Sequence, residues 1–435
     1  MKSRTPKVLH PLSGRALVDH VLEACAEAGI KRVVAVLNPA QPEVAQHIHG
    51  RCEVAYQAEQ LGTGHALSQV PEDVLGRGDV LVIGADAPLI RPETIRRLVE
   101  RHRAAKAAVT LATVIDPGRD DGRIVRGPDG LLERIVEAKD AGPVERRITE
   151  FNVGLYVFAG GSALLAALAA LRPGNRAGEL YLTDLVAELK PAEAILLDDP
   201  TEALGVNDRV QLARAGKAMR LRLLERLMLS GVTVTDPEST YVDAGVTVGQ
   251  DTVLEPFTSL RGRTRIGSDC RIGPGADLTD TVVADSCRIE YSWLKECRLA
   301  EGSDCGPFSK LRPGTEIGIR AHVGTFAEIV RSRIGAGTAV PHFSYLGDAV
   351  VGEGVNIGAG TITANYDGVS KHPTEIGDGS FVGVDTMFVA PRKMGRRSKT
   401  GAGSVVTKDI PDDSLAVGVP ARVIIDNCKC AITRA

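Results

Sequence analysis

The 435-residue sequence predicts an α/β domain followed by a parallel β-helix. Up to about residue 205, short apolar segments alternate with amphipathic ones, which is typical of a doubly wound parallel sheet. From Tyr241 to Val423, a branched aliphatic residue followed by Gly recurs on a six-residue period. Three such steps per turn are typical of a parallel β-helix.

The repeat contains ten aliphatic–glycine pairs, and neighbouring pairs often lie six residues apart. We expect each aliphatic side chain to point into a narrow core. We expect Gly and small polar residues to form the corners, where φ is often positive and a Cβ would be costly. The pairs are Val248-Gly249, Ile266-Gly267, Ile272-Gly273, Ile317-Gly318, Val323-Gly324, Ile334-Gly335, Val351-Gly352, Ile357-Gly358, Ile376-Gly377 and Val382-Gly383.

The first half contains clear helix and strand patterns. Helices are expected over Ala16–Ala28 and Pro92–Ala105. Ligands of a doubly wound sheet bind beyond the carboxyl ends of its strands, and Asp86 follows directly after one such strand. The expected buried strands are Lys31–Leu37, Val80–Ile83 and Ala108–Val114.

A connecting helix is expected over Asn207–Leu229. Its apolar residues recur at helical spacing, and its basic residues are expected to face solvent. The chain therefore divides into residues 1–208, a linker helix over 209–230, and residues 231–435.

Composition excludes several classes of function. The formal net charge of −3 does not suggest binding to nucleic acid or to a membrane surface. The sequence contains no run of about 18 apolar residues, so no membrane-spanning helix is predicted. The first residues lack the apolar region of a secretory signal. Eight scattered Cys fit a reduced, cytoplasmic protein. Cys428 and Cys430 form a close pair, but a single dithiol is a poor metal site.

Polar residues interrupt the aliphatic repeat between residues 331 and 367. Side chains with acid–base and amide chemistry on successive turns could come together on one face. They are His342, Tyr345, Asn356, Asn365 and Tyr366.

Several motifs, taken in order, carry a resemblance to a known family. The first half contains PKVLHP at 6–11, QAEQLGTGH at 57–65, GADAPL at 84–89, EFNVG at 150–154 and GVND at 205–208. The second half contains KLRPG at 310–314, HFSYLGDA at 342–349, VNIGAGTITANYDG at 355–368 and VGVDTMFVAP at 382–391. In this order and spacing the chain resembles the bifunctional N-acetylglucosamine-1-phosphate uridyltransferase / glucosamine-1-phosphate N-acetyltransferase family.

The resemblance covers nearly the whole chain and implies both fold and function. The expected fold is a Rossmann-like nucleotide-diphospho-sugar transferase domain followed by a left-handed parallel β-helix. The family makes UDP-N-acetylglucosamine for peptidoglycan and lipid A from UTP, acetyl-CoA, glucosamine-1-phosphate and N-acetylglucosamine-1-phosphate. The resemblance also implies a homotrimer.

Site residues for uridylyl transfer follow from the matching motifs. Asp86 and Asn207 would hold Mg²⁺, and Lys7 would contact phosphate. Such a transfer needs charge neutralisation and alignment more than covalent help. Gln57, Gly62 and Thr63 would contact uracil. The residues expected at the sugar and ribose are Gly122, Glu137 and Asn152.

Site residues for acetyl transfer also follow from the motifs. His342 would be the general base on the sugar amine, because an amine that attacks a thioester must lose a proton. Arg312 would hold the sugar phosphate. The residues expected to line the sugar and acyl pocket are Tyr345, Asn356, Asn365 and Tyr366. Those expected to bind acetyl-CoA are Ala359, Asn365, Tyr366 and Ala402.

The sequence departs from the family in both halves. Val330 stands where the family has a phosphate-binding Lys, and neither Arg331 nor Arg333 is expected to replace it cleanly. Val384 replaces a Ser and Gly418 an Arg near the expected CoA. These changes bear on acceptor identity and CoA affinity more than on the fold.

The family's first strand and its Gly-rich phosphate loop have no counterpart in this sequence, which begins near the end of that loop. A doubly wound sheet without its central strand would leave backbone groups unpaired. We therefore expect Met1 to be an internal residue of a longer natural protein.

Two other functions remain open at this point. One is a sugar-1-phosphate nucleotidyltransferase whose β-helix has only a structural, trimerising role. The other is a β-helix acetyltransferase for a different amine, which Val330 favours.

Overall fold

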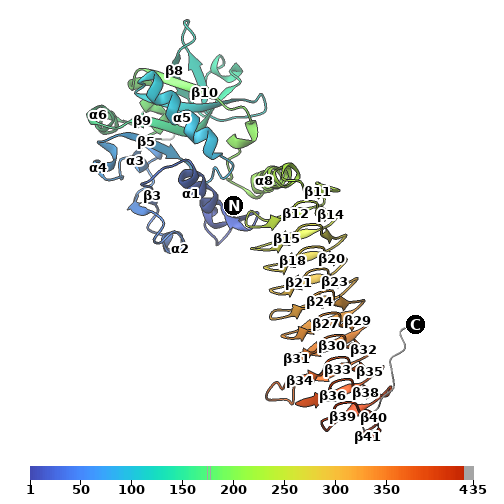
Figure 1. Cartoon of the computed structure of the whole chain (residues 1–435). Helices are drawn as coiled ribbons and strands as arrows, with labels where there is room; N and C mark the ends of the chain where they lie inside the picture. Colours follow the sequence, from blue (N-terminus) through green and yellow to red (C-terminus); the bar gives the residue numbers. More distant parts are fainter. Residues whose placement is uncertain (174, 177, 426–435) are drawn as a thin grey trace. The chain divides into compact units, whose positions relative to one another are not determined.

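The computed structural model describes residues 1–173, 175, 176 and 178–425. The chain forms two compact units, Met1–Met219 and Arg220–Ala435. Each is drawn in Figure 1 and is described here by itself. Within the described residues, no helix has the length and apolar character needed to cross a membrane. Cys428 and Cys430 lie outside the described residues.

The first unit is a mixed α/β domain. Its helices are α1 (Leu17–Glu27), α2 (Pro42–His47), α3 (Thr63–Leu67), α4 (Glu72–Leu75), α5 (Pro92–Ala105), α6 (Ser162–Ala170) and α7 (Leu185–Glu188), and α8 (Arg209–Leu229) contains the unit boundary. Short 3-10 turns are η1 (Lys7–Leu9), η2 (Glu145–Arg147), η3 (Leu182–Asp184) and η4 (Pro200–Ala203). Its strands are β1 (Pro11–Leu12), β2 (Arg15–Ala16), β3 (Val34–Leu37), β4 (Glu53–Tyr56), β5 (Asp79–Ile83), β6 (Val109–Ile115), β7 (Arg123–Arg126), β8 (Leu132–Val136), β9 (Glu150–Ala159) and β10 (Ala192–Leu196).

The main sheet has the order β10-β6-β9-β7-β8, and β5 also pairs with β9. The expectation of a wholly parallel sheet is wrong, because β9 runs antiparallel to both β5 and β6. Strand β9 is ten residues long, which lets it pair with three other strands. Strands β3 and β4 form a separate parallel pair. Among the described residues, β3 pairs with β4 alone and β5 with β9 alone.

Both faces of the main sheet are covered by helices. Along β9, Tyr156 and Phe158 face a core that includes Leu164 and Leu168 of α6. The alternate residues Leu155 and Val157 face a second core, which includes side chains of α1 and α5. The period of two along the strand thus separates the two cores. The expected helices and strands of this unit occur within a few residues of their predicted ends.

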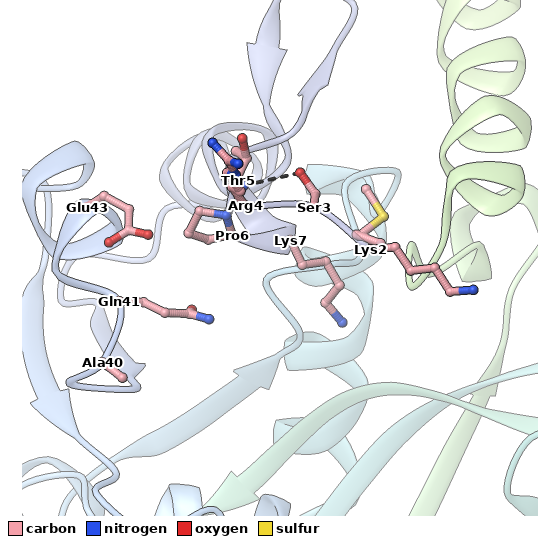
Figure 2. Close-up of a pocket in the computed structure, with 10 residues that line it drawn as sticks. Lys2, Ser3, Arg4, Thr5, Pro6, Lys7, Ala40, Gln41 and Glu43 are labelled. Carbon is pink, nitrogen blue, oxygen red and sulfur yellow. Dashed lines mark hydrogen bonds between the residues drawn. The ribbon is translucent and has the colours of Figure 1, made fainter.

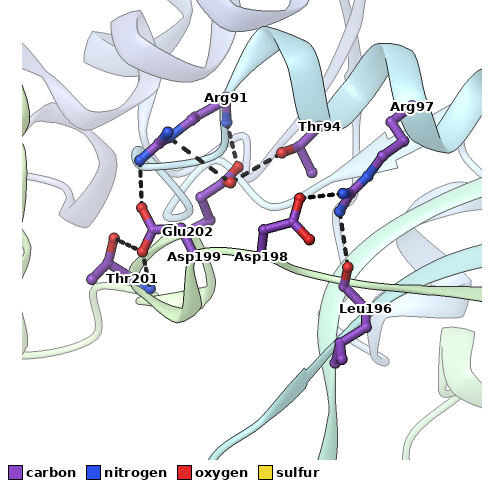
Figure 3. A network of polar contacts seen from close by, with 8 residues as sticks. All are labelled: Arg91, Thr94, Arg97, Leu196, Asp198, Asp199, Thr201 and Glu202. Atoms are coloured by element: carbon purple, nitrogen blue, oxygen red, sulfur yellow. Dashed lines mark hydrogen bonds and ion pairs between the residues drawn. The ribbon is translucent and has the colours of Figure 1, made fainter.

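Helix α5 begins at a buried carboxylate, shown in Figure 3. Glu202 of η4 accepts hydrogen bonds from the backbone nitrogen of Arg91 at 2.8 Å and from Oγ1 of Thr94 at 3.0 Å. The Glu202 side chain is 4% exposed. It therefore accepts from the backbone N–H of the N-cap residue Arg91, which the helix itself cannot satisfy, and it links α5 to a segment far away in sequence.

We predict that Glu202→Gln lowers the free energy of unfolding by about 1–3 kcal/mol, because one donor of the pair loses its acceptor. Glu93→Gln on the same helix is the control. Its side chain is 70% exposed and pairs with Arg96, so its loss is expected to cost about 0.5 kcal/mol or less. Urea unfolding of the full chain measures both, and equal losses would contradict a capping role for Glu202.

The second unit is a left-handed parallel β-helix with three faces, and its strands stack along one axis in Figure 1. The first face contains β11 (Thr233–Val234), β14 (Val253–Leu254), β17 (Arg271–Ile272), β20 (Arg288–Ile289), β23 (Asp304–Cys305), β26 (His322–Val323), β29 (Ala339–Val340), β32 (Asn356–Ile357), β35 (Phe381–Val382), β38 (Lys399–Thr400), β40 (Leu415–Gly418) and β41 (Ala421–Ile425). The second contains β12 (Tyr241–Val242), β15 (Ser259–Arg261), β18 (Asp277–Thr279), β21 (Trp293–Lys295), β24 (Lys310–Leu311), β27 (Ala327–Val330), β30 (Ser344–Gly347), β33 (Ile362–Ala364), β36 (Met387–Val389) and β39 (Val405–Val406). The third contains β13 (Thr247–Val248), β16 (Arg265–Ile266), β19 (Val282–Val283), β22 (Arg298–Leu299), β25 (Glu316–Ile317), β28 (Arg333–Ile334), β31 (Ala349–Val351), β34 (Thr374–Ile376) and β37 (Arg392–Met394).

The aliphatic residues of the repeat form one continuous core, as predicted. The prediction of frequent positive φ at the corners holds for small polar residues such as Asp251, but for few of the repeat glycines. Of the ten repeat glycines, only Gly273 has a positive φ. The others are needed because the next coil is too close for a Cβ: one built on Gly318 would lie 2.7 Å from the nitrogen of Ala336. Positive φ occurs instead at other corner residues, including Asp251 and Phe326.

The connecting helix α8 is less uniformly solvated than expected. Arg220 is buried, with its guanidinium 4.6 Å from the ring centroid of Tyr241 and a hydrogen bond to Glu238. One basic residue of the helix therefore packs against the first coil of the β-helix unit, rather than facing solvent.

Candidate active sites

The first candidate site lies beyond the carboxyl end of β5. Lys7, in η1, donates hydrogen bonds to Oδ2 of Asp86 at 2.6 Å and to Oδ1 of Asn207 at 2.8 Å. The backbone carbonyl of Asp86 accepts from Val206, which holds the segment before α8 against this strand end. Residues from three distant parts of the sequence thus meet at one ammonium group.

The oxygen pair of Asp86 and Asn207 fits a cation, because both atoms already contact the Lys7 ammonium. Within the described part of the chain, no group of three or more His, Cys, Asp or Glu side chains could hold a metal. A magnesium ion here would therefore take its other ligands from phosphates and water, as this ion commonly does.

A cavity of about 430 Å³ adjoins this site and is shown in Figure 2. Its lining comes from the N-terminal segment, from the loop before α2 and from the first turn of α2. Lys2, Arg4 and Lys7 are among the lining residues, with Glu43 as the acidic one. The excess of basic groups suits an anion.

A second part of the site surrounds the start of α3. Gln57 donates through Nε2 to the carbonyl of Gly62 at 3.0 Å, and Oγ1 of Thr63 accepts from the nitrogen of Leu182 at 3.0 Å. Gly62 has φ of 111°, and a Cβ there would lie 2.5 Å from the carbonyl oxygen of Leu180. These contacts tie the loop before α3 to the 180–182 segment.

The residues expected at the sugar and ribose also meet. The nitrogen of Asn152 donates to the carbonyl of Gly122 at 2.8 Å. A Cβ on Gly122 would lie 3.3 Å from Oε1 of Glu137. Burial raises the pKa of Glu137, although Oε1 accepts a hydrogen bond from Thr183 at 3.1 Å.

Two residues here were not found from the sequence. Thr183 contacts Glu137, and the Tyr156 hydroxyl accepts from Nδ2 of Asn152 at 2.5 Å. Neither lies in a motif, and a lone Thr or Tyr in a strand or turn gives no functional signal.

The second candidate site lies at one corner of the β-helix. His342 is exposed, between β29 and β30. On the next coil, Gly360 donates to the carbonyl of Phe343 at 2.7 Å, and on the coil after that, Asp385 donates to the carbonyl of Ala359 at 2.6 Å. These bonds stack the corner residues one above another.

The same column continues toward the C-terminus. Gly403 donates to the carbonyl of Val384 at 2.8 Å, so Ala402 lies on the coil after Val384. His342, Ala359, Val384 and Ala402 therefore occupy successive coils of one corner. Residues expected at the acyl donor share this column with the expected base.

A polar cluster lies on the face that follows this corner. Tyr345 of β30 and Asn365 both reach over Gly347. A Cβ on Gly347 would lie 2.7 Å from the Tyr345 hydroxyl and 2.6 Å from Nδ2 of Asn365. The absence of a side chain at Gly347 lets these two groups approach each other.

Charged groups border this cluster. Arg312 donates to Oε1 of Glu328 at 3.0 Å, and Glu328 is in register with Tyr345. Val330 is in register with Gly347 and is 2% exposed. Arg331 turns aside to pair with Asp348, and Arg333 pairs with Glu316.

The five polar residues that interrupt the repeat do not share one face. Asn356 lies on β32 of the first face and Tyr345 on β30 of the second, with His342 at the corner between them. Tyr366 is 59% exposed and its hydroxyl donates to the carbonyl of Gly368. Each coil contributes strands to three faces in turn. Residues that are close together in the sequence therefore lie on different faces.

We predict that Gly62→Ala lowers the free energy of unfolding by about 1–3 kcal/mol, because it combines a strained φ with a clash against the Leu180 carbonyl. The control is Gly29→Ala, where φ is 88° but no atom lies within 4 Å of the added Cβ. Urea unfolding of the full chain compares the two. A smaller loss for Gly62→Ala than for Gly29→Ala would show that the loop before α3 adjusts freely.

Comparisons with known proteins cover nearly the whole chain. A family model described as a MobA-like NTP transferase domain matches residues 1–189. The bifunctional protein GlmU of Carboxydothermus hydrogenoformans is 45% identical over 422 residues, 96% of this chain and 94% of its own length. GlmU of Brevibacillus brevis is 43% identical over 426 residues, which are 96% of this chain and 92% of that protein. GlmU of Listeria monocytogenes is 40% identical over 433 residues, which are 98% of this chain and 94% of that protein.

A solved structure of PerB from Caulobacter crescentus, in complex with CoA and GDP-perosamine, matches 28% of this chain and 56% of its own. Its identity of 24% and TM-score of 0.25 are too low to carry an argument.

Proposed function

The chain belongs to the family of bifunctional GlmU proteins, and from this premise we propose that it makes UDP-N-acetylglucosamine in two steps. An acetyl group passes from acetyl-CoA to glucosamine-1-phosphate, and a uridylyl group then passes from UTP to N-acetylglucosamine-1-phosphate. The product is a precursor of peptidoglycan and lipid A. The observation that carries this function is 45% identity to a GlmU protein over 96% of the chain.

In the acetyl transfer, the amine of glucosamine-1-phosphate attacks the thioester carbonyl. The C–N bond forms, the C–S bond breaks, and CoA leaves as its thiol. The His342 imidazole accepts the amine proton. This role is supported by the position of His342, which is exposed at the same corner of the β-helix as Ala359 and Ala402 on later coils. Tyr345, Asn356 and Asn365 on the adjoining faces would contact the sugar and the acyl group.

In the uridylyl transfer, a phosphate oxygen of the sugar attacks the α-phosphorus of UTP and pyrophosphate leaves. Such a step depends on charge neutralisation and alignment. Lys7 and the basic groups of the adjoining cavity would neutralise the triphosphate. Gln57, Gly62 and Thr63 would hold the uracil, and Gly122, Glu137 and Asn152 the sugar and ribose.

Asp86 and Asn207 are the proposed ligands of Mg²⁺, which supplies positive charge to the phosphates when bound. The convergence of both oxygens on the Lys7 ammonium supports this pair. Because Lys7 contacts both proposed ligands, its side chain would turn away from them toward the phosphates when the metal binds. The substrates UTP and acetyl-CoA support a cytoplasmic location.

A different amine acceptor is the second candidate function for the β-helix. It is favoured by Val330, which is buried and apolar next to the proposed pocket and so offers no charge to a sugar phosphate. Acetyl transfer to another amino sugar in place of glucosamine-1-phosphate would support this alternative.

We predict that His342→Ala lowers acetyl transfer by about 10²- to 10⁴-fold, the usual contribution of a positioned base, and leaves uridylyl transfer unchanged. Asp86→Asn is the matched variant and should show the reverse pattern, with uridylyl transfer reduced by about 10² or more. Release of free CoA and release of pyrophosphate measure the two activities. Equal loss of both activities in either variant would contradict two separate sites.

We also propose a homotrimer. The support is an exposed aromatic stack on the β-helix, formed by Tyr291, Phe308 and Phe326, with ring centroids 5.6 and 5.5 Å apart. These rings are 48%, 56% and 63% exposed, and a continuous apolar surface of this kind is typical of an interface. A closed assembly buries such a surface on every subunit.

We predict that Phe308→Glu weakens self-association, because it introduces a carboxylate into the middle of this stack. Light scattering at micromolar concentration should give the mass of three chains for the wild type and a smaller mass for the variant. Trp293→Glu is the control, since Trp293 is also exposed but lies on β21 rather than at the corner. A stable wild-type monomer would contradict the proposed assembly.

A further inference from the structure

Arg331 makes a geometrically defined contact that the proposed function does not use. It lies at a corner of the β-helix with φ of 46°. Its Nε and Nη2 donate to the two oxygens of Asp348 at 2.6 and 2.8 Å. This paired arrangement fixes both the guanidinium and the carboxylate in one orientation.

Asp348 in turn contacts the proposed acceptor pocket. Its Oδ2 accepts a second hydrogen bond, from Nδ2 of Asn365 at 2.5 Å. Asn365 is 5% exposed, so its neighbours hold it in place and only a small part of it can be reached from the surface. Hydrogen bonds thus connect the three side chains, from Arg331 at the exposed corner, through Asp348, to the buried amide of Asn365.

The hydrogen bond to Asp348 determines which end of the Asn365 amide faces the proposed pocket. An ionised carboxylate can only accept hydrogen bonds, so the NH₂ group must point toward Asp348. The pKa of Asp348 is lowered mainly by Arg331, and its hydrogen bond from Asn365 acts in the same direction. The amide oxygen of Asn365 is then directed away from Asp348.

We propose that Arg331 is a positioning residue of the acetyl-transfer site. Through Asp348, it holds the Asn365 amide with its oxygen available to accept a hydrogen bond from the amino sugar. The inference rests on the proposed acetyl transfer and adds one residue to it. Asn365 touches the substrate, whereas Arg331 acts through Asp348 and makes no substrate contact of its own.

The neighbouring residues explain why the positive charge lies at this position. Val330 is buried and in register with Gly347, under the Tyr345 and Asn365 groups. A buried aliphatic residue cannot orient a carboxylate, so the adjacent corner residue supplies the cation. The fork of an Arg fits the two carboxylate oxygens, whereas the point charge of a Lys does not fix their plane.

The test compares Arg331→Gln and Arg331→Lys with Arg333→Gln in the full-length chain. Arg333 is the matched control, because it pairs with Glu316 on the third face and its side chain is 73% exposed. We expect Arg331→Gln to raise KM for glucosamine-1-phosphate about 10-fold and Arg331→Lys to have an intermediate effect. The kcat for acetyl transfer should change less than KM, and uridylyl transfer should not change.

A double-mutant cycle with Asp348→Asn separates positioning from a general structural role. If Arg331 acts through Asp348, the double variant should raise KM no more than the larger single effect. Additive effects, or a KM for Arg331→Gln equal to that of Arg333→Gln, would overturn the proposal.

Crystal structures of the wild type and Arg331→Gln provide a readout that does not depend on activity. Asn365 should keep its hydrogen bond to Asp348 in the wild type and change its side-chain rotamer in the variant. An unchanged Asn365 in the variant would overturn the positioning role. If the wild type fails to acetylate glucosamine-1-phosphate while Asn365 responds as expected, the proposed acceptor fails and the positioning role stands.

Discussion

The hydrogen bonding between successive coils of the β-helix is the interaction on which the second site depends. Backbone nitrogens on each face donate to the neighbouring coil, which brings residues one coil apart in sequence into vertical columns. The coils pack so closely that Gly318 and Gly335 cannot carry a Cβ. A site built this way needs no mobile loop to assemble. Its residues are fixed by the same bonds that hold the fold together.

The first unit brings its site together in a different way. Here the strands of a mixed sheet end near one another, and the segments after them contain proposed site residues. Asp86 follows β5, whereas Lys7 and Asn207 arrive from segments far away in sequence. Contacts such as that between Glu202 and the start of α5 hold distant segments in register, so stability and site geometry depend on the same polar groups. The two units therefore support two chemistries with independent structural requirements.

The architecture could be predicted from the sequence, because its patterns are local. The aliphatic repeat predicts the β-helix core, and α5 begins and ends at the predicted residues. The antiparallel course of β9 could not be predicted, since strand direction depends on long-range pairing. The reason for the repeat glycines was also missed, because the limiting contact is with the next coil and not within the turn.

For the sites, too, local features could be predicted from the sequence and long-range placement could not. Motifs predict which residues carry chemistry, but not how three faces distribute them, so Tyr345 and Asn356 lie on different faces. The link from Arg331 through Asp348 to Asn365 has no sequence signature, because each pair lies 17 residues apart and meets only when coils stack.

We propose that one corner column of the β-helix, from His342 through Ala359 to Ala402, is the acetyl-transfer site. A crystal structure of the full chain with CoA and glucosamine-1-phosphate tests it most directly. We expect the CoA thiol beside Ala359 and the sugar amine within hydrogen-bond distance of the His342 imidazole, about 2.6–3.2 Å. CoA bound along another corner, or an amine out of reach of His342, would contradict it.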